Sequence, residues 1–200
     1  MCGIVGIARM LNNDLLDKDR DIFIQLLNAG VMRGHHGTGV FSVDPDGGTN
    51  SVKIGGAPYL LMVSEMFHEF WENIKRNKSQ ILIGHNRFAT KGEKSTDHAH
   101  PFLKGNIMMV HNGTLDFSSE LPNFRDFDVD SEALANSINE LGIEETINKT
   151  SGAYAIVYWD TKAKTLNLIR NAERPLFVAL DNFLGKIIVA SEKEMLDWIL

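Results

Sequence analysis

The sequence predicts an α+β layered fold, because its strand-like segments come in groups with helical segments between and after them. Four strand-like runs follow one another between residues 153 and 190. Two long amphipathic segments, 15–32 and 59–76, separate the early strands without setting up a regular strand–helix–strand repeat. Grouping of this kind favours an α+β layered arrangement over a regular βαβ repeat.

The first half of the chain is expected to hold four strands and two helices. Short runs of mainly apolar residues flanked by turn-forming residues predict strands at 3–9, 40–43, 51–54 and 80–84. Apolar residues at helical spacing predict helices over 15–32 and 59–76. Glycine-rich and Asp-Pro-Gly composition predicts turns at 33–39 and 44–48, so the strand at 51–54 can pair back as a hairpin, and residues 86–92 lead away from the fourth strand.

The second half is expected to carry more strands than helices. An apolar strand at 106–111 ends at Asn112-Gly113, a strong turn pair. The four further strands are predicted at 153–159, 165–170, 176–180 and 186–190. Helices are predicted over 131–141, with Asp130 as a candidate N-cap, and over 144–149 and 192–200.

Composition limits the function classes. The chain has 200 residues and a formal net charge of −6, from 20 basic and 26 acidic residues. This length favours a single domain over 1–200. The acidic balance and the lack of a basic run argue against nucleic-acid binding. No apolar stretch is long enough for a bilayer span. The sequence does not open with a basic segment followed by an apolar one, as a secretory signal would, so we expect a cytoplasmic protein with no membrane partner.

Cys2 is the residue most indicative of chemistry. It is the only cysteine, so it cannot form an internal disulfide, which suits a reducing cytoplasm. It follows Met1 directly, and removal of Met1 would place a thiol and a free α-amine on one residue. An α-amine has a pKa of about 7.7–8.0, so its neutral fraction can act as the base for the adjacent nucleophile. The alternative is a small buried side chain, as free cysteines usually are.

The seven histidines do not predict a metal site or a cofactor. His98 and His100 form an H-x-H pair and His35 and His36 are adjacent, but neither pair has the two-group spacing of a zinc site. A Cys–His dyad that uses His85 or His111 is an alternative to the α-amine base.

Eight segments in order along the chain resemble the motifs of class II glutamine amidotransferases. The chain opens with MCGIVGI, and the other segments are Arg33-Gly34 with Gly37 and Gly39, residues 84–92 (GHNRFATKG), His100-Pro101, residues 111–113 (HNG), residues 130–132 (DSE), residues 151–155 (SGAYA) and residues 174–176 (RPL). Each match is weak alone, but together and in this order they cover nearly the whole chain.

The resemblance implies a role for each matched residue. Cys2 would be the nucleophile, and the Asn112 side chain with the Gly113 backbone N–H would form the oxyanion hole. Arg87 would bind the α-carboxylate of glutamine through its planar fork, and Asp130 would bind the α-ammonium. Phe88 and Thr90 are further candidates for the glutamine pocket.

Each of these residues also has a structural interpretation that needs no ligand. Asn112-Gly113 is commonly an ordinary turn, Asp130 can be only a helix cap, and Arg87 can pair with a surface acid. Phe88, like Phe102, Met108 and Met109, can be core packing. The chain also departs from the family pattern at His36, Phe88 and Lys91, which replace an acid, a tryptophan and a histidine.

The resemblance implies an N-terminal-nucleophile (Ntn) hydrolase fold, a four-layer α/β/β/α sandwich with two antiparallel sheets. It implies hydrolysis of L-glutamine to glutamate and ammonia through a Cys2 thioester. Since no acceptor site is encoded, we expect a separate ammonia-accepting synthetase or ligase as the partner. The alternatives are hydrolysis of another γ-glutamyl or small amide, a non-catalytic glutamine-binding regulatory subunit, and a structural interaction domain.

Overall fold

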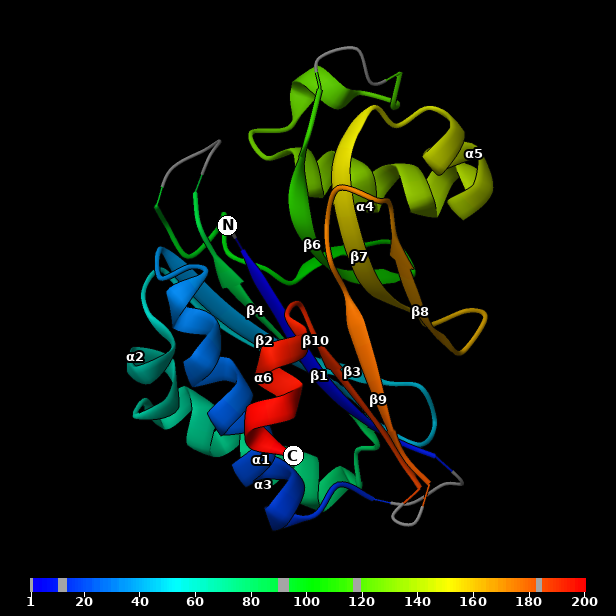
Figure 1. Ribbon diagram of the computed structural model, residues 1–200. Helices are drawn as coiled ribbons and strands as arrows, with labels where there is room; N and C mark the ends of the chain where they lie inside the picture. The colour runs from blue at the N-terminus through cyan, green and yellow to red at the C-terminus, as the bar shows by residue number, and fades with distance from the viewer. Residues whose placement is uncertain (1, 11–13, 90–93, 117–119, 183–184) are drawn as a thin grey trace.

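Two antiparallel sheets form the centre of the protein in the computed structural model (Figure 1). The structure describes residues 2–10, 14–89, 94–116, 120–182 and 185–200. The larger sheet has the order β3-β2-β4-β1-β10-β9, made by β3 (Thr49–Ile54), β2 (Gly37–Val43), β4 (Ile81–Arg87), β1 (Gly3–Arg9), β10 (Lys186–Ala190) and β9 (Phe177–Asp181). The smaller sheet has the order β5-β6-β7-β8, made by β5 (Phe102–Lys104), β6 (Ile107–Leu115), β7 (Gly152–Asp160) and β8 (Thr165–Arg170).

Helices cover the outer face of each sheet, as Figure 1 shows. The larger sheet is covered by α1 (Asp17–Ala29), α2 (Pro58–Met62), α3 (Glu65–Asn77) and α6 (Lys193–Ile199). The smaller sheet is covered by α4 (Asp130–Leu141) and α5 (Ile143–Asn148). Short 3₁₀ turns at Gly30–Met32 and Phe124–Asp126 complete the described elements.

Side-chain alternation along the strands builds the layers. In β1, Val5 and Ile7 point to the helices, whereas Ile4 points to the second sheet. In β6, Met109 packs under α4 and Val110 packs between the sheets. Alternation with period two is what a strand imposes. Three separate apolar clusters therefore lie between four layers, and the predicted α/β/β/α sandwich is confirmed.

The cluster between the sheets sets how the functional elements meet. Phe41, Ile83 and Val110 are completely buried there. Each such side chain contributes about 1.5–3 kcal/mol relative to an exposed one. This packing holds β1 and β4 of the larger sheet against β6 of the smaller sheet.

Most predicted elements are confirmed, with three differences in the first half. The helix predicted over 59–76 is two helices, because Ser64 caps α3 by accepting the Phe67 N–H at 3.2 Å. The strand β2 already begins at Gly37, inside the predicted turn. The strand β4 continues to Arg87, so Asn86 and Arg87 do not lead away from it.

The predicted turn at Asn112-Gly113 is wrong, since both residues lie inside β6. Asn112 pairs with Ala155 and Gly113 pairs with Tyr154 in the ladder with β7. Nine consecutive pairs with β7 outweigh the local turn preference of an Asn-Gly dipeptide. The three-residue strand β5, which pairs with the start of β6, has no counterpart in the prediction.

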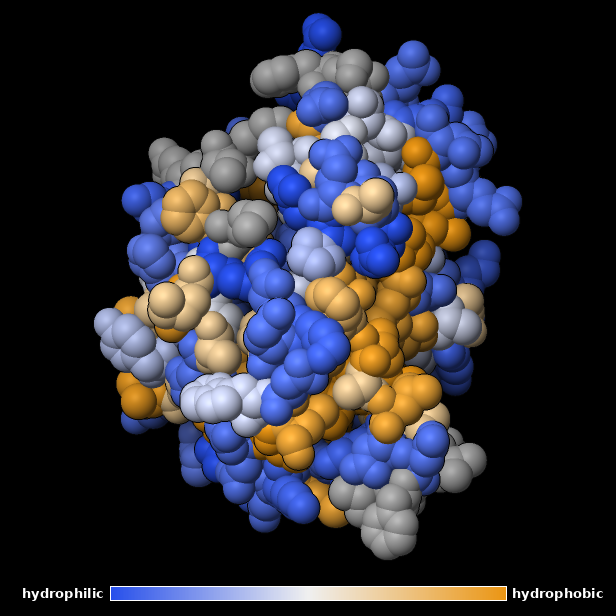
Figure 2. All heavy atoms as spheres, in the orientation of Figure 1, coloured by the Kyte–Doolittle hydropathy of each residue, from blue (hydrophilic) through white to orange (hydrophobic). Residues whose placement is uncertain are grey.

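One edge of the larger sheet is apolar and exposed. The edge strand β9 exposes Phe177, Val178 and Leu180, and Figure 2 shows an apolar band over β8 and β9.

Among the described residues, none of the helices has the length and apolar character that crossing a membrane requires.

Candidate active site

Strand pairing brings the start of the chain beside the end of β4. Gly3 pairs with Asn86 in the β1–β4 ladder, so Cys2 lies opposite the segment that carries Arg87 and Phe88. The Phe88 backbone N–H donates to the Cys2 Sγ at 3.2 Å, and the thiol lies 3.5 Å from the Phe88 carbonyl oxygen. The antiparallel ladder thus fixes the position of the sulfur.

The environment of Cys2 keeps its thiol protonated. Burial raises the pKa of Cys2, and the Asp130 carboxylate acts in the same direction. The hydrogen bond from Phe88 and the charge of Arg87 oppose this rise in pKa without cancelling it. A thiol with a raised pKa needs a base before it can attack a carbonyl carbon.

Asn112 reaches the same place from the second sheet. Its Nδ2 donates one hydrogen to the Ser191 Oγ at 2.7 Å, which leaves a second amide hydrogen for another acceptor. Ser191 directly follows β10 and also accepts the Ile4 N–H at 2.8 Å. One buried hydroxyl therefore ties Asn112 to the strand that begins after Cys2.

Gly113 has to be glycine in this structure. A Cβ at this position would collide with the Ala153 carbonyl oxygen across the ladder and would lie 2.5 Å from the His111 Nε2. The absence of a side chain therefore lets β6 approach β7 closely here. Gly113 also lines both of the cavities that Cys2 lines.

Arg87 and Asp130 come from different layers but line one cavity. Arg87 ends β4 and is 3 % exposed. Burial lowers the pKa of Arg87, while Cys2 and Asp130 act to raise it. The Asp130 carboxylate accepts the N–H groups of Leu115 and Ser131, both at 2.9 Å, so its orientation is fixed.

Asp130 is not the N-cap that the sequence suggested. It is the first residue of α4, and Val129 occupies the N-cap position without a side-chain bond. The aspartate instead joins the start of α4 to the end of β6 through Leu115. A carboxylate in this position can bind a cation as well as order the backbone.

Two small cavities meet at Cys2, Phe88 and Gly113. The first, of about 20 Å³, is lined in addition by Arg87, His100, His111, Val129, Asp130 and Ser131. The second, of about 50 Å³, is lined in addition by Arg33, Asn112, Thr114 and Arg174. The residues that the sequence assigned to the site are therefore brought together, as far as the structure describes them.

Phe88 is not a core residue, in contrast to Phe102, Met108 and Met109, which are buried as expected. Phe88 is 39 % exposed, lines both cavities and lies 4.8 Å from the His36 ring. The His36 Nδ1 accepts the Ala89 N–H at 3.0 Å.

Two further residues that the sequence singled out, Thr90 and Lys91, lie outside the described residues.

Burial disfavours the charged form of three histidines near the site. Burial lowers the pKa of His85 to about 3, and it also lowers those of His100 and His111. The His85 Nε2 lies 3.0 Å from the His111 carbonyl oxygen, and the His111 Nδ1 lies 2.9 Å from the Ser131 Oγ. In the described part of the chain, both hydrogen bonds of the Cys2 sulfur go to Phe88, which argues against a Cys–His dyad.

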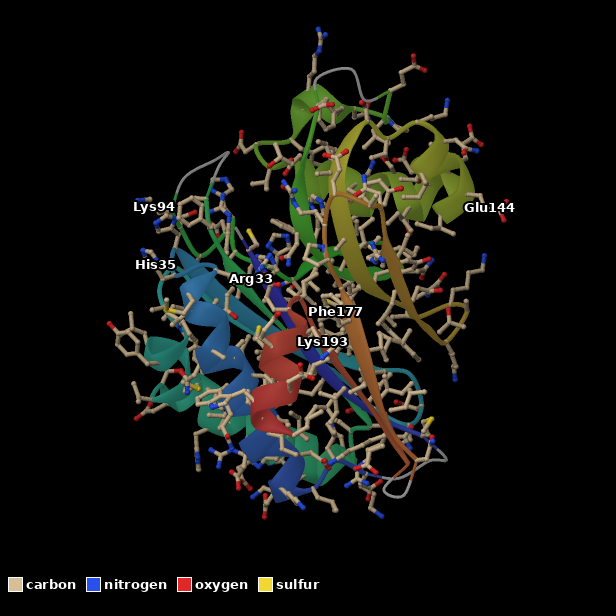
Figure 3. All side chains as sticks on the ribbon, viewed as in Figure 1. Arg33, His35, Lys94, Glu144, Phe177 and Lys193 are labelled. Carbon is tan, nitrogen blue, oxygen red and sulfur yellow. The ribbon has the colours of Figure 1, made fainter. Side chains whose placement is uncertain are left out.

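The sequence does not reveal Ser191 or the positioning contact of Arg33. The Arg33 Nε donates to the Cys2 carbonyl oxygen at 2.7 Å, and Figure 3 shows Arg33 near the N-terminal end of β1. The RG motif marked Arg33 without indicating this contact. Ser191 lies in no motif, so nothing local in the sequence points to it.

Comparison with known proteins agrees with the motifs. The family described as the glutamine amidotransferase domain matches residues 85–197, more than half of the chain. The glutamine–fructose-6-phosphate aminotransferase (isomerizing) of Bacillus licheniformis is 30 % identical over 203 residues, covering 92 % of this chain and 31 % of that protein.

Further relatives with the same name give similar values. The protein of Buchnera aphidicola is 26 % identical over 216 residues, covering 95 % of this chain and 32 % of its own length. That of Neisseria meningitidis is 29 % identical over 201 residues, covering 90 % and 30 %. The chain thus spans about a third of the length of these curated relatives. Together, the family match and the fold establish that this chain belongs to the glutamine amidotransferase domain family.

Proposed function

We propose that this chain hydrolyses the side-chain amide of L-glutamine through a γ-glutamyl thioester on Cys2, giving glutamate and ammonia. The observation that carries this proposal is the convergence of Cys2, Gly113, Arg87 and Asp130 on one cavity. A cation and an anion that line the same cavity as Cys2 match the two charged groups of a free amino acid. Such a pair orients the substrate and so places its amide at the sulfur.

In the proposed hydrolysis, groups of the chain itself accept and return the proton and stabilise the charge. After Met1 is removed, the α-amine of Cys2 takes the thiol proton, and the sulfur attacks the amide carbon. Gly113 N–H and the second amide hydrogen of Asn112 stabilise the oxyanion that forms. Collapse of this intermediate breaks the C–N bond, the amine returns its proton to the leaving nitrogen, and ammonia departs. Water then attacks the thioester to release glutamate and restore the thiol.

We propose further that the ammonia passes to a separate synthetase or ligase. The named relatives are aminotransferases about three times as long as this chain, which is consistent with a glutaminase part working beside an acceptor part. Hydrolysis of another γ-glutamyl amide is the second candidate, because Arg87 and Asp130 would also hold its free amino-acid end.

The test combines intact mass with product release. We expect the purified chain to lack Met1 and to release one glutamate per ammonia from L-glutamine. We expect little release from Nα-acetylglutamine, which cannot place a cation at Asp130. Turnover of γ-glutamyl anilides with none of glutamine would favour the second candidate. A processed chain that binds glutamine without turning it over would contradict the enzymatic proposal.

Ser191→Ala tests the positioning of Asn112. The serine hydroxyl accepts from Asn112 and Ile4 and lies 3.3 Å from the Ile4 carbonyl oxygen, to which it donates. Without it Asn112 loses its anchor, so we expect kcat to fall about tenfold or more while KM for glutamine changes little, because the oxyanion exists only after attack.

The matched control is Ser137→Ala. Ser137 is equally buried, but its hydroxyl donates to the Ala133 carbonyl oxygen within α4. We expect this variant to lose stability without a selective loss of kcat. Equal kinetic effects of the two substitutions would rule out the positioning role of Ser191.

A further inference from the structure

The second cavity beside Cys2 contains two guanidinium groups that the proposed hydrolysis does not use. Arg33 and Arg174 line it together with Asn112, Gly113 and Thr114. L-Glutamine has one carboxylate, and Arg87 in the other cavity is the residue proposed to bind it. The bond from Arg33 Nε to the Cys2 carbonyl oxygen uses only part of that guanidinium group, and Arg174 has no role in the proposed reaction.

Arg33 is held rigidly and still has capacity to donate. It is 8 % exposed, its Nε donates to the Cys2 carbonyl oxygen, and its Nη1 pairs with Glu192. Its Nη2 is buried and has no hydrogen-bond partner within the described residues. A buried charged donor without an acceptor is costly, and a ligand oxygen in the cavity would remove this cost.

Arg174 adds a second positive charge to the same space. It lies in the segment between β8 and β9 and is half-buried, and its Nη1 donates to the neighbouring Glu173 carbonyl oxygen at 2.9 Å. The charge of Arg174 acts to lower the pKa of Arg33 and that of buried His111, so the two guanidinium groups repel each other across the site. Glu192 supplies one negative charge against two positive ones.

We propose that the Arg33–Arg174 cavity is an oxyanion-binding subsite that takes a phosphate or carboxylate group beside the nucleophile. Guanidinium groups bind such oxyanions through paired, charge-assisted hydrogen bonds. The Arg33 side chain is already fixed by Cys2 and Glu192, so little conformational entropy is lost on binding. The subsite meets the glutamine cavity at Cys2 and Gly113, where ammonia is released.

The anion that best fits this location is the acidic group of the ammonia acceptor. That assignment rests on the proposed function, whereas the existence of the subsite does not. A free inorganic ion has the same chemistry and is the other source of such a group. The two sources differ in whether the site tolerates a substituent on the anion.

The test is calorimetric titration of the processed chain with inorganic phosphate and with methyl phosphate, against sodium chloride at equal ionic strength. We expect both phosphates to bind and Arg174→Ala to weaken both about tenfold. The matched control is Arg170→Ala, because Arg170 is exposed on β8, donates to a neighbouring carbonyl oxygen and does not line the cavity. We expect the control to bind like the wild type.

Five results would overturn the proposed function or part or all of the subsite proposal. If Arg174→Ala and Arg170→Ala weaken phosphate binding equally, the subsite proposal is wrong. It is also wrong if phosphate gives no more heat than chloride. If inorganic phosphate binds and methyl phosphate does not, the anion is not the acidic group of the ammonia acceptor. Phosphate that raises KM for glutamine competitively shows that the cavity belongs to the glutamine site. Absence of glutaminase activity with intact phosphate binding overturns the proposed function, and with it the acceptor assignment, but leaves the subsite in place.

Discussion

Replacing Cys2 by alanine is expected to reduce glutamate release from L-glutamine to the uncatalysed rate, a loss of about 10⁴-fold or more. In the proposed reaction the sulfur forms the thioester, and within the described chain its hydrogen bonds involve only the Phe88 backbone. The substitution removes the nucleophile and leaves Arg87 and Asp130 in place. We therefore expect the variant to bind glutamine with nearly unchanged affinity in a calorimetric titration.

Adding residues before Cys2 tests whether the free α-amine is the base that accepts the thiol proton. The extended chain keeps the sulfur, but the free α-amine moves away from it. Because burial raises the pKa of the thiol, we expect this extended chain to be as inactive as Cys2→Ala. An active extended chain would show that another group accepts the proton.

The pH dependence follows from the same two groups. Burial raises the pKa of the thiol, so the rate depends on the neutral fraction of the α-amine. An unperturbed α-amine has a pKa of about 7.7–8.0. We expect kcat/KM to fall as pH decreases below that pKa. His85 does not supply this titration, because its pKa is about 3.

The catalytic candidates could be predicted from the sequence because each lies in a short motif, but their mutual placement could not. Cys2 and Arg87 meet through the β1–β4 ladder, and Gly113 reaches them only when the second sheet packs on the first. These contacts depend on long-range pairing, which local patterns do not encode.

The errors in the prediction have the same origin. Asn112-Gly113 carries a strong turn preference, yet pairing with β7 keeps both residues extended within β6. Ser64 breaks an otherwise continuous apolar pattern because its hydroxyl caps α3. Ser191 positions Asn112 from the far end of the chain, so only the folded structure reveals it.

Replacing Arg87 by methionine is expected to lower kcat/KM for glutamine about 100-fold, because a charged hydrogen-bonding partner of the α-carboxylate is lost. Asp130→Asn is expected to have a smaller effect of about tenfold or more, since the amide keeps one acceptor oxygen for the backbone. The Asp130 carboxylate holds the Leu115 and Ser131 N–H groups, so thermal unfolding has to be measured alongside the kinetics.

Substrate analogues distinguish the two ends of this charge pair. We expect Arg87→Met to remove the preference for glutamine over its α-carboxamide. We expect Asp130→Asn to remove the preference for glutamine over Nα-acetylglutamine. A general loss of structure would instead lower activity on all substrates equally. Each variant therefore has a characteristic change in specificity, which measures orientation of the substrate and not the amount of folded protein.

Two matched controls test whether the loss of a buried cation, or of a charge on α4, is by itself enough to change substrate specificity. Arg9 is also a buried arginine, but it pairs with Asp19 at the far end of β1. Glu132 lies on α4 two residues after Asp130 and pairs with Lys104 at 2.7 Å. We expect Arg9→Met and Glu132→Gln to leave the specificity for glutamine unchanged, even where the first lowers stability. If they alter it as much as the Arg87 and Asp130 variants do, the cavity beside Cys2 does not bind the amino-acid end of the substrate.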